Sequence, residues 1–65
     1  MKVKDLLYIC DSSVRASVYN IPTDNIYLKP ASVGMLLGSG HWILNEEIEE
    51  ITINDGVIYL SVVVE

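Results

Sequence analysis

The chain has 65 residues, of which 51% are hydrophobic, and a formal net charge of −5 at pH 7. A chain this short forms one domain at most, residues 1–65, and buries only about 60% of the surface that it exposes when unfolded. Its negative charge opposes binding to duplex nucleic acid and to anionic membranes. No signal peptide is visible, and no apolar run reaches transmembrane length.

The usual aids to the stability of a small domain are disulfides, a metal or self-association. Cys10 is the only cysteine, so no disulfide can form within the chain. Together with one histidine, His41, it cannot supply a structural zinc shell, and we expect no metal and no other cofactor. Self-association is the remaining source of burial, so we expect a homo-oligomer. The single free thiol points to the cytoplasm.

Three segments carry regular patterns before residue 45. Apolar residues at helical spacing predict a short helix within residues 1–11; they are Val3, Leu6, Leu7 and Cys10. Residues 14–19 and 26–29 alternate as strands around a turn at 22–25, which predicts a hairpin that Pro30 ends. Its inward residues would include Val18, Ile26 and Leu28, and its outward ones Arg15, Ser17 and Tyr19. Ser32 would cap a short central helix over residues 33–37, ended by Gly38.

The strongest local pattern is Asp55-Gly56 between two β-branched runs, which predicts a hairpin with a two-residue turn. The register would then place Asn54 opposite Val57 and Glu49 opposite Val62. One face would be apolar and would carry Ile51, Ile53, Ile58, Leu60, Val62 and Val64. We therefore predict an α+β fold in which a short N-terminal helix packs on a small antiparallel sheet of two hairpins, with a short central helix or loop.

The most function-like segment is Gly38-Ser39-Gly40-His41-Trp42. Glycines let backbone N–H groups point at an anion, Ser39 and His41 add hydrogen-bond donors, and Trp42 offers a stacking face for a base. The alternative is structural, because the same residues can stop a helix, form a loop and place Trp42 in the core. The pattern contains no Walker or dinucleotide-binding motif.

Tyr19, Tyr27 and Tyr59 are predicted on outward strand faces, with Arg15 and Lys29 nearby in sequence. Outward aromatic residues on a sheet either bury a subunit interface or stack on bases. The predicted interface is the uncovered face of the last hairpin or the long edge beside it. The interface residues predicted on that face are Val57, Tyr59 and Val63.

Four glutamates lie within residues 46–50. They form either an acidic patch that faces a protein or a solvated strand edge that prevents unwanted pairing. Catalysis is not expected, because His41 has no acid or nucleophile near it in sequence.

The opening V-K-D-L-L, the middle strand and the closing I-E-E-I-T-I-N-D-G-V-I-Y-L resemble short, mostly uncharacterised proteins of phages and prophages of Gram-positive bacteria. The resemblance implies a non-enzymatic counter-defence protein in the host bacterial cytoplasm. One such activity is an oligomeric sponge that sequesters a cyclic-nucleotide signal of immunity, as in anti-CBASS proteins. The alternatives are an acidic inhibitor of a host defence protein, as in anti-CRISPRs, and a small structural or regulatory phage protein. For the sponge, the predicted nucleotide-binding residues are Trp42, His41, Ser39, Tyr19, Tyr27, Arg15 and Lys29.

Overall fold

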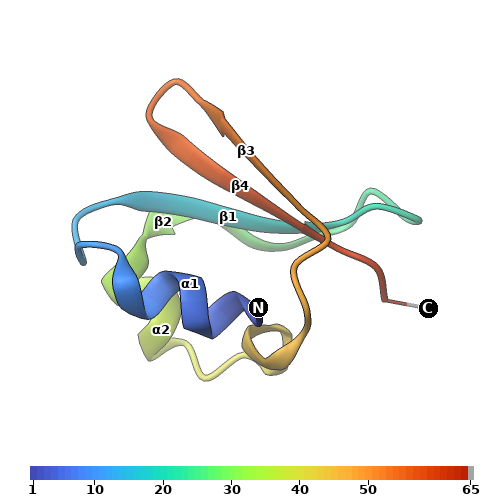
Figure 1. The fold of residues 1–65 in the computed structure, drawn as a ribbon, viewed down its shortest axis with the longest axis horizontal. Helices are drawn as coiled ribbons and strands as arrows, with labels where there is room; N and C mark the ends of the chain where they lie inside the picture. Colours follow the sequence, from blue (N-terminus) through green and yellow to red (C-terminus); the bar gives the residue numbers. More distant parts are fainter. Residues whose placement is uncertain (65) are drawn as a thin grey trace.

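The computed structural model describes residues 1–64 and contains one four-stranded sheet with all its helices on one face (Figure 1). The elements in chain order are α1 (Val3–Ile9), β1 (Arg15–Asn20), β2 (Ile26–Ser32), α2 (Val33–Gly38), the 3₁₀-helix η1 (Trp42–Asn45), β3 (Glu50–Asn54) and β4 (Val57–Val62). The predicted α+β class, the N-terminal helix, the central helix and the two hairpins are confirmed. The prediction that Pro30 ends the second strand was wrong, because β2 continues to Ser32.

The sheet is mixed, because its two hairpins join through a parallel pair. The strand order is β2-β1-β4-β3, and β1 runs parallel to β4 from the Arg15–Val57 pair to the Asn20–Val62 pair. The prediction of a wholly antiparallel sheet was wrong on this point. An alternating pattern shows which face of a strand is buried, but it carries no information on the direction of a distant neighbour.

The core lies between the sheet and the helix layer. Because β2 and β3 are the two outer strands, the chain between them must cross one face of the sheet, and it does so as α2 and η1. These elements lie on the same side as α1, below the sheet in Figure 1. The buried residues that close the core are Val3, Leu7, Ala16, Val18, Leu28, Val33, Leu36, Ile43, Leu44, Leu60 and Val62.

The two short α-helices form where their sequences predict. In α1, Val3 and Leu7 are buried one turn apart, which fits the predicted apolar face. In α2, the Ser32 hydroxyl accepts a hydrogen bond from the Met35 N–H at 3.4 Å and so caps the helix. Before β1, the Asp11 carboxylate accepts bonds from the N–H and hydroxyl groups of Ser13, and these bonds lower its pKa.

The last hairpin has the predicted turn and register. Asp55 and Gly56 both adopt positive φ, at 51° and 75°, as a two-residue type I′ turn requires. Asn54 pairs with Val57 and the pairing continues to Glu50 with Ser61. Glu49 lies outside β3 and donates its N–H to the Ser61 carbonyl at 2.7 Å, so the predicted Glu49–Val62 pair does not form.

The predicted apolar face of this hairpin is only partly covered. Leu60 and Val62, on the central strand β4, are buried, whereas Ile51 and Ile53 on β3 are 52% and 70% exposed. The reason is position, since β3 is an outer strand and the tip of the β3–β4 hairpin extends away from the helices (Figure 1). The prediction that these two isoleucines build the core was wrong.

The first hairpin is irregular along β2. Val18 pairs with Leu28 and Tyr19 pairs with Ile26, so Tyr27 is an extra residue that shifts the register of the strand pair. A second shift of the register lies between Ala16 and Val18. The extra residue turns Ile26 away from the core, and it is 59% exposed rather than inward as predicted.

The second shift lies opposite Ser17, where β2 contains Pro30, which has no N–H to donate. Ser17 lies on the predicted outward face of β1, between the core-facing Ala16 and Val18, but it is buried there, and its hydroxyl donates to the Leu28 carbonyl at 2.8 Å.

Asn20, at the end of β1, is a buried polar residue that connects three segments. Its side-chain amide donates to the Thr23 hydroxyl at 2.9 Å and to the Val64 carbonyl at 3.1 Å, and its side-chain oxygen accepts from the Val64 N–H at 2.9 Å. These bonds join the turn after β1 to the segment after β4. No sequence motif marks this residue in advance.

We expect Gly56→Ala to lower the free energy of unfolding by about 1–2 kcal/mol, because an alanine at φ 75° is strained. Urea denaturation measures the change. Gly38→Ala is the matched control: it lies in α2 with no heavy atom within 4 Å of the added Cβ. Its stability should be unchanged or raised by up to about 1 kcal/mol. Equal effects of the two substitutions would contradict the turn assignment.

We expect Asn20→Ala to cost about 1–3 kcal/mol in the same assay, because it leaves partly buried backbone groups of Val64 without partners. Asn25→Ala is the control, since Asn25 is exposed and its described hydrogen bonds use only its backbone groups. It should change stability by no more than about 0.5 kcal/mol. A small effect of Asn20→Ala would show that these bonds do not hold the two segments together.

Candidate functional site

The loop between α2 and η1 brings the Gly-Ser-Gly-His-Trp segment against β2. The Ser39 hydroxyl donates to the Leu36 carbonyl at 2.6 Å and accepts from the His41 N–H at 3.2 Å. Gly40 has a φ of 64°, a conformation that glycine adopts without strain. These features reverse the chain after α2. Because Ser39 uses its only O–H in the loop, it has no donor left for the predicted ligand contact.

The 3₁₀-helix η1 decides how Trp42 is oriented. His41 caps this helix, with its Nδ1 accepting a hydrogen bond from the Ile43 N–H at 3.0 Å. Ile43 and Leu44 enter the core, whereas Trp42 stays 50% exposed. Of the two interpretations left open by the sequence, a core position for Trp42 is therefore excluded. The core is filled by the two residues that follow it.

Tyr27, His41 and Trp42 meet at the surface, and we call them the aromatic cluster. The ring centroids of Tyr27 and Trp42 are 5.2 Å apart at an interplanar angle of 68°, an edge-on arrangement. The His41 ring lies 5.4 Å from Trp42 and 6.2 Å from Tyr27. Tyr27 reaches the other two rings from the irregular part of β2, where it is the extra residue.

The aromatic cluster has two chemical capabilities. The exposed part of the Trp42 ring offers a π-face on which a planar group can stack. Since His41 Nδ1 accepts from Ile43, the neutral imidazole carries its proton on Nε2, which is then a donor. A stacking face with an adjacent N–H donor suits a planar heterocycle.

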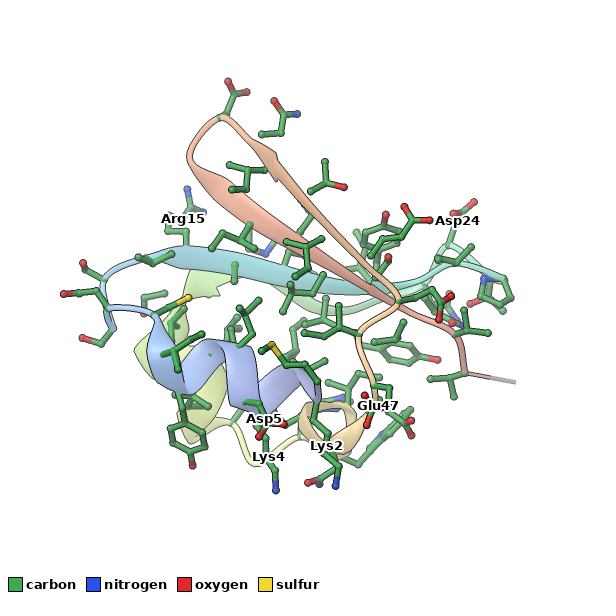
Figure 2. The ribbon with its side chains drawn as sticks, viewed as in Figure 1. Lys2, Lys4, Asp5, Arg15, Asp24 and Glu47 are labelled. Carbon is green, nitrogen blue, oxygen red and sulfur yellow. The ribbon has the colours of Figure 1, made fainter. Side chains whose placement is uncertain are left out.

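The remaining predicted ligand residues lie apart from the aromatic cluster. Arg15 points to the helix-free side of the sheet (Figure 2), and its Nη2 donates to the Pro30 carbonyl at 3.4 Å. Tyr19 lies on that same side, because its neighbours Val18 and Asn20 are on the opposite face of β1. Lys29 is exposed on β2, two residues from Tyr27. The structure therefore brings together Tyr27, His41 and Trp42, but not Arg15, Tyr19 or Lys29.

The predicted interface residues lie on or beyond the helix-free side of β4. Tyr59 pairs with Ser17 and is half-buried, and Val63, after the strand, is 45% exposed. Val57 is 6% exposed within the single chain, so it offers little surface to another molecule.

The acidic run divides into two parts. Glu47 accepts a hydrogen bond from the Met1 amine at 2.9 Å, which raises the pKa of that amine, and the Glu46 carbonyl accepts from the Val3 N–H at 2.9 Å. Figure 2 shows Glu47 near Lys2, with which it forms an isolated antiparallel bridge. Glu49 and Glu50 are exposed at the start of β3. Within residues 1–64, hydrogen bonds to the N-terminal segment come from Glu46 and Glu47, whereas the Glu49 N–H bonds the Ser61 carbonyl of β4.

The exposed apolar side chains of β3 are a surface feature that the sequence pattern does not reveal. Ile51 and Ile53 were assigned to the core because they alternate with polar residues. One signal that pointed to an outer strand was present, namely the glutamates that lead directly into it.

Comparisons of the chain with models of protein families, with curated proteins and with solved structures find no match. The resemblance to phage proteins stays a prediction. Within residues 1–64, no helix has the length and apolar character needed to cross a membrane. The same residues contain no group of three or more His, Cys, Asp or Glu side chains that could hold a metal ion, and no pocket opens on the surface that they form.

The exposure of Trp42 predicts unequal effects of two neighbouring truncations. Trp42→Ala should lower the free energy of unfolding by about 1–2 kcal/mol, because it removes the contacts with Tyr27 and His41. Ile43→Ala should cost about 2–5 kcal/mol, because it leaves a cavity in the core. Urea denaturation of both variants is the measurement. A larger loss at Trp42 than at Ile43 would identify Trp42 as a core residue after all.

Proposed function

We propose that this protein is a non-enzymatic phage counter-defence protein that self-associates and sequesters a cyclic-nucleotide immune signal. The observation that carries the proposal is the half-exposed Trp42 ring beside Tyr27 and His41. A nucleobase is the planar heterocycle that such a surface suits. The resemblance of both ends of the chain to phage proteins supplies the biological setting.

Stacking accounts for recognition of the base. A base stacked on an aromatic side chain contributes about 1–3 kcal/mol and does so with little dependence on the base. Tyr27 holds the Trp42 ring from one edge, so the ring is already oriented before a ligand arrives. Less conformational entropy is then lost on binding. His41 Nε2 adds one donor for a base or sugar acceptor.

The phosphates require a positive group, because the chain as a whole carries a charge of −5. We assign this role to Lys29, which is exposed on the same strand as Tyr27. Lys29 follows the buried Leu28, so by alternation it lies on the helix-free side of the sheet, as Arg15 does. Arg15 is the weaker candidate, because its guanidinium already donates to the Pro30 carbonyl at 3.4 Å. A single lysine implies moderate affinity that falls as salt is raised.

Calorimetric titration against a panel of cyclic di- and trinucleotides tests the proposal. We expect at least one member to bind, Trp42→Ala to weaken it by about 5- to 150-fold, and Trp42→Phe to keep much of the affinity. Tyr8→Ala is the matched control, because Tyr8 is an exposed aromatic residue on α1 outside the aromatic cluster. Absence of binding across the panel would overturn the proposal, as would equal losses in Trp42→Ala and Tyr8→Ala.

A second candidate function is inhibition of a host defence protein through the β3 edge. It is favoured by the exposed Glu49 and Glu50, which lie directly beside the uncovered Ile51. An acidic rim next to an apolar residue suits a basic partner surface. The double variant Glu49→Gln/Glu50→Gln separates the two functions, because it should abolish inhibition yet leave nucleotide binding by the aromatic cluster unchanged.

A further inference from the structure

We propose that β3 pairs with β3 of a second copy, antiparallel and about a two-fold axis at Thr52, so that two four-stranded sheets become one sheet of eight strands. This inference deepens the self-association in the proposed function and rests on that part of it. It needs no nucleotide.

The first observation is that the β3 edge is open. All five residues of β3 are exposed, including Ile51 and Ile53. The strand pairs with β4 without a bulge, and it contains no proline or lysine. An apolar outer strand with unpaired backbone groups is a template for another strand.

The second observation is that the other edge of the same sheet is protected. Along β2 the register shifts twice, Pro30 removes a donor, and Lys29 adds a charge. These are devices by which natural sheets prevent edge-to-edge pairing. Because the β2 edge carries three of them and β3 carries only one charge, Glu50 at its first position, self-association is directed to β3.

The hydrogen-bond pattern fits the two-fold axis. In a hairpin with a two-residue turn, the residues that flank the turn form a hydrogen-bonded pair, and such pairs alternate along the strands. Asn54, Thr52 and Glu50 therefore direct their backbone groups to β4. Ile51 and Ile53 direct theirs to the free edge. A two-fold axis at Thr52 sets Ile51 opposite Ile53 of the second copy, so these outward groups meet and exchange both N–H···O bonds in each pair.

The side chains select this register. With the axis at Thr52, isoleucine faces isoleucine, Thr52 faces Thr52, and Glu50 faces the neutral Asn54 of the second copy. Apolar pairs and threonine pairs across antiparallel strands are favourable. A shift of two residues in either direction would set Glu49 or Asp55 opposite an isoleucine. A parallel arrangement would bring Glu50 next to Glu50 of the second copy.

One repulsive contact remains in the proposed dimer. At each end, beyond the isoleucine pairs, Glu49 of one copy lies opposite Asp55 of the other. Both are exposed carboxylates, so salt screens their repulsion. The affinity between the two copies should therefore rise with ionic strength. The affinity for the nucleotide should fall with ionic strength.

The aromatic clusters stay accessible in this dimer. Each one includes Tyr27 of β2, the strand at the far edge of its own sheet, whereas the two β3 strands meet in the middle. The dimer would thus carry two ligand surfaces at its two ends.

Sedimentation velocity over a range of concentrations tests the inference. The wild-type chain of 7.2 kDa should sediment at about twice that mass. Ile53→Lys should weaken the dimer at least about tenfold, because it sets a charge at the edge. Ile26→Lys is the matched control, an exposed isoleucine on the protected edge, and should stay dimeric. Since Ile53 is mostly exposed, the Ile53→Lys chain should keep its circular dichroism spectrum.

Cross-linking tests the register. In a Cys10→Ala background, Thr52→Cys should form a disulfide between copies, because a non-hydrogen-bonded antiparallel pair has a Cα separation of about 4.5 Å. Asn54→Cys should form no such disulfide, because position 54 would lie opposite Glu50 of the second copy rather than opposite position 54. Three results would each overturn the inference. The protein could be monomeric at all concentrations, the dimer could be unaffected by Ile53→Lys, or the copies could cross-link through position 54 instead of position 52. A dimer that binds no nucleotide would support the inference and overturn the proposed nucleotide sequestration. A monomer that binds nucleotide would overturn the inference, together with the proposed self-association, and leave nucleotide sequestration standing.

Discussion

The parallel pairing of β1 with β4 is the contact on which the rest of this molecule depends. It joins residues 15–20 to residues 57–62 and is the only pairing between the two hairpins in the described sheet. Because it occupies the inner edges of both hairpins, β2 and β3 become the outer strands. The chain that connects them must then cross one face of the sheet, so α2 and η1 join α1 on that face. The position of Trp42 and the exposure of Ile53 both follow from this arrangement.

The two outer strands give the molecule two different ends. At β2, the added residue Tyr27 breaks the regular ladder and holds the exposed ring of Trp42. At β3, an unbroken ladder leaves Ile51 and Ile53 uncovered. An irregular edge resists pairing and presents side chains, whereas a regular one presents its backbone. The proposed ligand surface and the proposed dimer edge therefore lie at opposite edges of one sheet and do not compete for surface.

A chain of 65 residues has too few large side chains to cover both faces of its sheet, and small polar residues close the central strands instead. The hydroxyl of Ser17 donates to a carbonyl of β2, and that of Ser61 donates to the Glu50 carbonyl at 3.3 Å. Asn20 bonds the backbone of Val64 in the same way. Among residues 1–64, no buried side-chain polar atom lacks a partner. Burial of these groups therefore carries little desolvation cost, since each keeps its hydrogen bonds.

By itself, the sequence determined the features that depend on neighbouring residues. Asp55-Gly56 specified the turn and register of the last hairpin because few residues accept positive φ, and Ser32 specified the start of α2 because its hydroxyl reaches the Met35 N–H. Tyr27, His41 and Trp42 were also recognisable as separate candidates. Only the tertiary structure decided that these three rings meet, that β1 runs parallel to β4, and that Ile53 lies in solvent. Each of these depends on which segments far apart in the chain pair with one another. Several segments have similar hydrophobic patterns and could serve as partners. Local hydrogen bonds and backbone angles cannot make that choice.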